Sequence, residues 1–271
     1  MERERSTVEA ASQPATTQSL VADLHALGVA PGAVLIVHSS LSRLGYVAGG
    51  APAVVQALLD AIGPSGTIVM PAFSGDLSDP SRWEAPPVPE AWWPVIRAQS
   101  PAFDPAITPA RAMGAIVDCF LRFPGVRRSA HPRDSFAAHG PAASRIVDDH
   151  PLAYAMGERS PLARIYDLDG EVLLLGVDHG NNSSLHLCEY RADLPITDWI
   201  SEGSPVLLDG VRTWVTYPDR AGNSDDFAEL GEAFALAGKE RRARVGAGTG
   251  RLMRQRDVVD FGVRWLEAYR G

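Results

Sequence analysis

A continuous apolar run, Val172 to Val177, constrains the fold of this chain more than any other segment. Such a run, without polar alternation, is typical of a strand buried on both faces, as in sheets covered by helices. A polar loop from Asp178 to Asn182 follows it, and Ser183 and Ser184 are residue types that favour the start of a helix. The segment therefore predicts strand, loop and helix start, a common arrangement at the ligand-binding edge of α/β enzymes.

The rest of the chain repeats the alternation of buried strands and helices. Two more apolar strands are predicted at 33–37 and 67–73, with a helix at 51–62 between them, which is the length of a parallel crossover unit. The remaining predicted elements are helices at 19–29, 109–123, 141–149, 226–236 and 256–269 and a β-hairpin around Asp209 and Gly210. The sequence thus predicts an α/β fold with a mixed central sheet and helices on both faces.

A long irregular segment, residues 74–108, interrupts this pattern with prolines, acids and large aromatic side chains. Long loops inside compact domains are uncommon unless they cover or form a binding site. Trp83, Trp92, Trp93 and Phe103 are too many large apolar groups for a solvated linker. We expect this inserted loop, together with the small hairpin, to pack near the substrate site.

Length and composition narrow the protein class. With 271 residues, one domain over residues 19–271 is expected, preceded by a disordered lead-in at residues 1–18. No apolar run approaches the ~20 residues of a membrane span, and the polar N-terminus lacks the form of a secretory signal. The two cysteines, Cys119 and Cys188, form neither a disulfide framework nor a four-ligand zinc site, and fit a reducing cytoplasm. The net charge of −8 argues against nucleic acid as a partner, and no metal-binding motif is present.

His186 and Glu189 are the strongest candidates for catalysis from the residues themselves. Their spacing of three places both side chains on one face of the predicted helix, near its start. An imidazole beside a carboxylate is typical of a general base. A His–x–x–Glu pair is also common on ordinary helix surfaces, so the pair alone leaves both interpretations open.

Two other polar loops are predicted at the same end of the sheet. His38, Ser39 and Ser40 follow a buried strand, where N–H groups and hydroxyls can bind an anionic group such as a pyrophosphate. The other loop, 127–131, carries two arginines, a serine and a histidine. A serine-rich turn and a solvated surface are the simpler interpretations of these two loops.

Several ordered motifs together resemble one enzyme family. They are VHSSLSRLGYVAGG (37–50), GTIVMP (66–71), FDPAITPARAMGAI (103–116), RRSAHPRDSFAAHGP (127–141) and SPLARIYDLDGEVLLLGV with SSLHLCEYRADLP (160–195). Through them the chain resembles the aminoglycoside 3-N-acetyltransferase family over nearly its whole length from about residue 19. The resemblance implies a cytoplasmic antibiotic-resistance enzyme, with residues 19–271 as a single acetyltransferase domain. It would transfer acetyl from acetyl-CoA to the 3-amino group of the 2-deoxystreptamine ring of an aminoglycoside.

The resemblance also implies roles for individual residues. His186 would be the general base that deprotonates the amine for direct attack on the thioester, with no covalent intermediate. Glu189 would flank the site, and Asp219 is the best positional match for a carboxylate that orients His186. The residues implied to bind the co-substrate are His38, Ser39, Ser40, Ser42, Arg128, Ser129, Ala130, His131, Ser135 and Phe136. The carboxylates implied to hold the ammonium groups of the drug are Asp76, Asp178, Glu189 and Asp219.

Two alternatives remain open. The chain could be an acyl-CoA-dependent N-acyltransferase of the same family that acts on another amine, or an inactive protein that binds CoA or aminoglycosides. The intact His186, Glu189 and 38–40 loop argue against an inactive protein. Neither the drugs accepted nor the oligomeric state follows from the sequence, and no membrane or nucleic-acid partner is expected.

Overall fold

A seven-stranded mixed sheet forms the centre of the computed structural model, which describes residue 8, residues 13–195 and residues 199–271. The strand order is β3-β4-β2-β1-β5-β9-β8. The three central strands are parallel, and all other neighbours are antiparallel. The strands are β1 (Val34–Ser39), β2 (Thr67–Pro71), β3 (Arg127–Arg128), β4 (Phe136–His139), β5 (Glu171–Leu175), β8 (Arg241–Val245) and β9 (Gly248–Arg254). The mixed sheet predicted from the sequence is confirmed.

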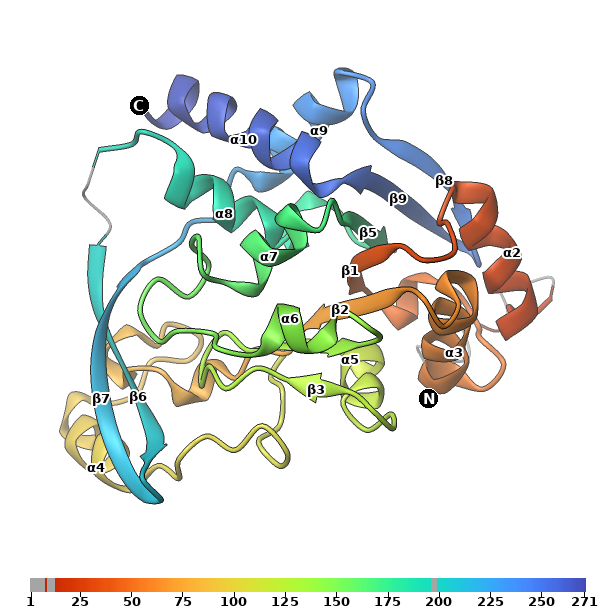
Figure 1. The fold of residues 1–271 in the computed structure, drawn as a ribbon. Coiled ribbons are helices and arrows are strands. Elements are labelled where there is room, and N and C mark those ends of the chain that lie inside the picture. The colour runs from red at the N-terminus through yellow and green to blue at the C-terminus, as the bar shows by residue number, and fades with distance from the viewer. Residues whose placement is uncertain (1–7, 9–12, 196–198) are drawn as a thin grey trace.

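Helices cover both faces of the sheet, as Figure 1 shows. Alternate residues of β1 point to opposite layers, because Leu35 and Val37 belong to one apolar cluster and Ile36 to the other. The first layer contains α2 (Thr17–Leu27), α3 (Gly50–Ile62) and α5 (Ala115–Phe120). The second contains α6 (Ala143–Val147), α7 (Pro161–Asp167), α8 (Ser184–Arg191), α9 (Phe227–Leu236) and α10 (Gln255–Arg270). The predicted α/β class with helices on both faces is therefore confirmed.

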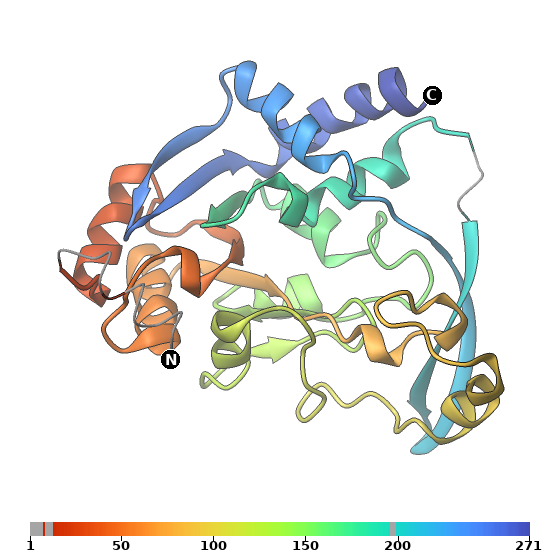
Figure 2. The same ribbon diagram turned by 180° about the vertical axis from the view of Figure 1, so that it is seen from behind.

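A separate two-stranded hairpin, β6 (Trp199–Leu208) and β7 (Val211–Arg220), lies at the opposite end of the molecule from α2 and α3 (Figures 1 and 2). The 74–108 segment, which precedes the hairpin in the chain, lies beside it. It contains α4 (Trp93–Gln99) and the short turns η2 (Gly75–Leu77), η3 (Pro80–Arg82) and η4 (Glu90–Trp92). The Phe103 N–H donates to the Pro205 carbonyl at 3.0 Å, and Arg212 Nε donates to the Ser100 carbonyl at 3.0 Å. Residues 100–103 of this loop thus pack against the hairpin.

The predicted elements differ from the structure in several places. The helix expected at 109–123 begins only at Ala115, because Gly114 adopts a positive φ of 87° before it. The β8–β9 hairpin, which extends the central sheet, is missing from the sequence prediction. Before residue 19, Ala15 bridges to Val47 and Thr16 caps α2. The predicted domain limits stay a prediction.

The predicted lead-in lies for the most part outside the described residues. Within the described ranges, no helix is long and apolar enough to cross a membrane.

Candidate active site

The start of α8 brings His186 and Glu189 together, as their spacing predicts. The Asn182 side chain accepts a hydrogen bond from the Ser184 N–H at 3.1 Å, in the turn that leads into α8. His186 Nδ1 lies 2.7 Å from Glu189 Oε2. With an ionised Glu189 this bond places a proton on Nδ1, which leaves the Nε2 lone pair available to accept one. The pair has the geometry of an oriented general base.

Glu189 is buried, with 1% of its side chain exposed, yet its environment favours the anion. Burial alone would raise the pKa of this carboxyl. Hydrogen bonds from His186, from the Asn223 N–H at 2.9 Å and from Arg270 at 2.7 Å outweigh burial and hold the pKa below its usual range. Glu189 therefore stays ionised beside His186 at neutral pH.

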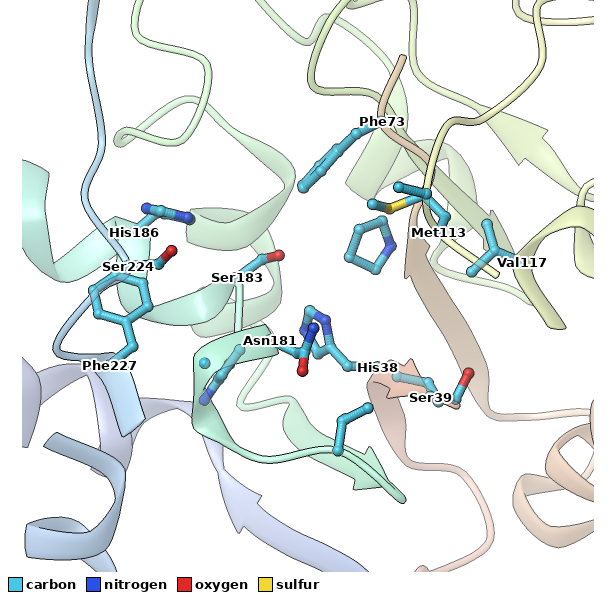
Figure 3. A pocket seen from close by; sticks show the side chains of 16 residues that line it. His38, Ser39, Phe73, Met113, Val117, Asn181, Ser183, His186, Ser224 and Phe227 are labelled. Carbon is cyan, nitrogen blue, oxygen red and sulfur yellow. The ribbon is translucent and has the colours of Figure 1, made fainter. Parts of the chain in front are cut away.

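A cavity of about 230 Å³ opens next to this pair. Figure 3 shows His186, Ser224 and Phe227 on one side of it and Phe73 and Met113 on the other. The His186 and Phe227 rings contact each other, with centroids 4.9 Å apart. The imidazole of His186, the predicted base, therefore borders a cavity that is large enough for a reacting group.

The wall formed by the end of β1 carries two polar atoms that have no partner among the described residues. They are His38 Nε2 and Ser39 Oγ, both inaccessible to solvent. Burial, and then the nearby His179 and His186, lower the pKa of His38 to about 3, so its imidazole is neutral. Buried polar groups are normally hydrogen-bonded, so two unpaired ones in a cavity wall indicate a site for a polar ligand.

A second cavity of about 670 Å³ adjoins the first, because Ser39, Met113 and Asn181 line both. Ser40 and Ser42, in the loop after β1, also line it. The facing wall is the 112–115 segment, which the sequence prediction assigned to a helix. Its positive φ values at Ala112 and Gly114 open the backbone there. The signal for this wall in the sequence is therefore a pair of residues with positive φ and not a charged motif.

The 128–136 residues implied to bind the co-substrate do not line either cavity. Arg128 donates instead to the Ser135 hydroxyl and the Ser74 hydroxyl, at 2.9 and 2.8 Å, and also bonds the Ala72 carbonyl. Ser129, His131, Ser135 and Phe136 are at most 1% exposed, and Ala130 is a surface residue. Arg128 and Ser135 thus tie β3 and β4 to the segment after β2. The co-substrate role implied for residues 128–136 stays a prediction.

Three of the four implied substrate carboxylates lie away from His186. Asp219 accepts hydrogen bonds from the Tyr190 hydroxyl and the Arg220 N–H, and Glu189 takes the position beside His186 that was expected for it. Asp76 pairs with Arg111 at 2.5 Å beside another cavity. Asp178 accepts from the Gly180 N–H and faces a cavity lined by Arg43 and Arg251. Among the described residues that line the His186 cavity, none carries a carboxylate.

Other candidate bases and nucleophiles are already engaged. Both ring nitrogens of His131 have partners, the Leu152 carbonyl and the Asp134 N–H. His179 contacts Glu240 at 2.6 Å and Asn182 at 3.3 Å. Burial strongly raises the pKa of the Cys188 thiol, so it is not a thiolate nucleophile.

Comparison with known proteins gives the family. A model of the aminoglycoside 3-N-acetyltransferase family matches residues 36–267. The chain belongs to this family. The SPbeta prophage-derived aminoglycoside N(3')-acetyltransferase-like protein YokD of Bacillus subtilis (strain 168) is 43% identical over 96% of this chain and 95% of that protein. Its crystal structure matches with a TM-score of 0.95, at 42% identity over 98% of both chains.

Two further family members bear on the chemistry. Aminoglycoside N(3)-acetyltransferase VIII of Streptomyces fradiae is 36% identical over 99% of this chain and 97% of its own length. The solved structure of AAC-IIIb with CoASH matches with a TM-score of 0.86, at 33% identity over 96% of this chain and 98% of that one. As a member of the aminoglycoside 3-N-acetyltransferase family, the chain is an acyltransferase.

Proposed function

We propose that this enzyme acetylates the 3-amino group of the 2-deoxystreptamine ring of aminoglycosides, with acetyl-CoA as co-substrate and His186 as general base. The observation that carries the proposal is the His186–Glu189 pair at the wall of a cavity that adjoins a second, larger one. One cavity can receive the amine and the other the co-substrate. Family membership supports the acetyl transfer itself.

The residues of the two cavities fit acetyl-CoA. Ser39, Ser40 and Ser42 offer hydroxyls along the larger cavity, and the unpaired His38 Nε2 and Ser39 Oγ offer hydrogen bonds where the two cavities meet. Bound acetyl-CoA would supply the acetyl group as a thioester. The neutral His38 can donate from Nε2 without competing with His186 for a proton, since its pKa is near 3.

His186 performs the proton transfer. An ammonium has no lone pair, so the amine must lose a proton before or during attack. Nε2 of His186 accepts that proton, and the Glu189 carboxylate at Nδ1 stabilises the resulting imidazolium. With the amine and the acetyl donor bound in adjoining cavities beside the base, direct transfer would need no covalent enzyme intermediate.

A second candidate is acetylation of an amine other than an aminoglycoside. The absence of carboxylates among the described residues lining the His186 cavity favours this candidate, because polycationic drugs are normally held by acids. The relative in Bacillus subtilis is also described only as like an aminoglycoside acetyltransferase.

The deciding experiment is thiol release from acetyl-CoA with kanamycin-, gentamicin- and apramycin-type drugs, alongside amines of single charge. We expect the enzyme to turn over the drugs. We expect His186→Asn to lower this turnover by about 10²–10⁴-fold. Turnover of singly charged amines with none for any drug would establish the second candidate. Activity above about a third of the parent in His186→Asn would assign the base elsewhere.

A further inference from the structure

We propose that Arg270 is a positioning residue for the proposed base: it holds Glu189 against His186 and offsets the negative charge beside the imidazole. The role rests on the proposed function of His186. Arg270 lies in the last turn of α10, far from His186 in sequence and outside the motifs that suggested catalysis.

Every nitrogen of the Arg270 guanidinium is engaged. Nη1 donates to Glu189 Oε1 at 2.7 Å. Nε donates to Asp226 Oδ2 at 2.7 Å, and Nη2 donates to Asp226 Oδ1 and to the Asn223 carbonyl. The bidentate interaction with the Asp226 carboxylate fixes the plane of the guanidinium. The third nitrogen, Nη1, is therefore directed at Glu189.

This arrangement fixes Glu189 in turn. Its Oε1 accepts from both Arg270 and the Asn223 N–H, which leaves Oε2 for His186 Nδ1. The same 222–227 segment packs on the imidazole, since a Cβ at Gly222 would lie 3.5 Å from the His186 ring and Phe227 contacts it. Arg270 thus connects α10, the 223–226 segment and α8 at one carboxylate.

The charges around His186 determine the sign of the effect. The groups that face His186 are Glu189, then Arg270 and Asp226 behind it, and His38 across the cavity. His38 is neutral because burial lowers its pKa. Arg270 is therefore the cation that offsets Glu189 and Asp226. Without it, the two uncompensated carboxylates would favour the imidazolium, and His186 would lose its proton only at higher pH.

The test compares Arg270→Gln, Arg270→Lys and Asp226→Asn. We expect the acid limb of the kcat/KM profile to move up by about one pH unit in Arg270→Gln, which corresponds to roughly tenfold lower kcat/KM at pH 6 and little change at pH 9. Arg270→Lys keeps the charge and should stay close to the parent profile. Asp226→Asn removes a negative charge and should move the limb in the opposite direction. Arg264→Gln, an exposed arginine on the same helix, is the matched control.

An NMR titration of the His186 ring, assigned from the His186→Asn spectrum, gives a readout that needs no substrate. We expect the pH midpoint of this titration to lie below that of the parent in Asp226→Asn and above it in Arg270→Gln, the same order as in the kinetic profiles. Identical titrations and superimposable profiles in all variants, with only the melting temperature changed, would overturn the proposal and leave Arg270 a structural residue. If His186→Asn remains active but the NMR midpoints shift as expected, the proposed base has failed while the coupling of Arg270 to His186 stands.

Discussion

The Glu189 carboxylate shows how a buried charge can be kept ionised and directed at once. Its burial opposes the charge, and three donors from three different segments compensate for it. Because two of these donors occupy Oε1, the remaining oxygen has a single orientation toward His186. The base is therefore oriented by the same contacts that make the buried carboxylate tolerable.

Ser39 gives a direct test of where the co-substrate binds. Its hydroxyl has no partner in the described part of the chain, so Ser39→Ala should leave the melting temperature unchanged. It should raise the KM for acetyl-CoA about 2–10-fold through loss of one hydrogen bond, with kcat and the KM for the amine nearly constant. Ser135→Ala is the matched control. The Ser135 hydroxyl bonds Ala72 and Arg128, so that change should lower stability without raising the KM for acetyl-CoA. The reverse pattern would place the co-substrate in the 128–136 loop.

Asp219 should make stability depend on pH. Burial, and then the Asp134 charge, raise its pKa to about 6, above the 3.8 of a free side chain. The folded protein therefore binds this proton more tightly than the unfolded chain, and ionisation costs stability as pH rises from about 4 to about 6. Asp219→Asn removes this cost. The difference in free energy of unfolding between Asp219→Asn and the parent, measured by urea unfolding, should therefore shift in favour of the variant by on the order of 2 kcal/mol from pH 4 to pH 7.5. An equal difference at both pH values would contradict this.

The acids also show what the sequence could reveal about single residues. His186 and Glu189 were predictable as a pair because helix geometry alone brings residues three apart together. Asp219 and Asp76 were assigned by position, but their partners, Tyr190 and Arg111, are distant in sequence. Which carboxylate meets which donor is set by packing, and no local pattern records it.

Helices and strands were likewise predictable where a local pattern determines them and not where packing does. Strands such as β1 and β5 were predictable because unbroken apolar runs have few other uses in a soluble chain. β8 and β9 were missed because four arginines and three glycines between Arg241 and Arg251 interrupt the apolar pattern of a strand. In addition, β8 lies at the sheet edge, and most of its side chains are exposed. The 109–114 segment resembles a helix start, but a conformation set by Ala112 and Gly114 turns it into a cavity wall. α7 had an available signal, since Ser160 caps it and Pro161 occupies its first position.

The packing of α10 on α8 depends on Gly262. A Cβ at this position would lie 2.6 Å from Cys188 Sγ, so the two helices approach as closely as glycine allows. Gly262→Leu should force them apart and cost about 1–3 kcal/mol in the free energy of unfolding. It should also lower kcat, because Arg270 and Glu189 lie on the separated helices. Ala268→Leu, on the exposed face of α10, should change neither quantity, and a fully active, equally stable Gly262→Leu would refute this account.

Across the whole molecule, the hairpin and the 74–108 segment form one unit that meets the body of the enzyme through buried charges. Glu202 on β6 accepts from the Asp79 N–H at 2.7 Å, which joins the loop to the hairpin. It also bonds Arg133 Nη1 at 3.1 Å, which joins both to the segment before β4. Arg133 further contacts Asp134 and Asp219 at 3.4 and 3.9 Å. Buried charges thus carry much of the attachment, beside aromatic contacts such as His131–Tyr217 and Tyr190–Trp199, whereas the central sheet is held by two apolar clusters.

This difference predicts that the hairpin unit can loosen while the sheet stays intact. Glu202→Gln keeps an acceptor for the Asp79 N–H but removes the charge opposite Arg133, which should weaken the attachment by about 1–3 kcal/mol. Hydrogen–deuterium exchange should accelerate in residues 74–104 and 199–220, while β1 and β5 keep the protection of the parent. Glu158→Gln, which removes an exposed ion pair with Arg191, should leave both regions unchanged. Equal acceleration in β1 and in the hairpin would mean that the molecule opens as one unit. The buried charges around Arg133 would then belong to the same cooperative core as the sheet, because loss of the charge on Glu202 would have been transmitted to strands that it does not touch.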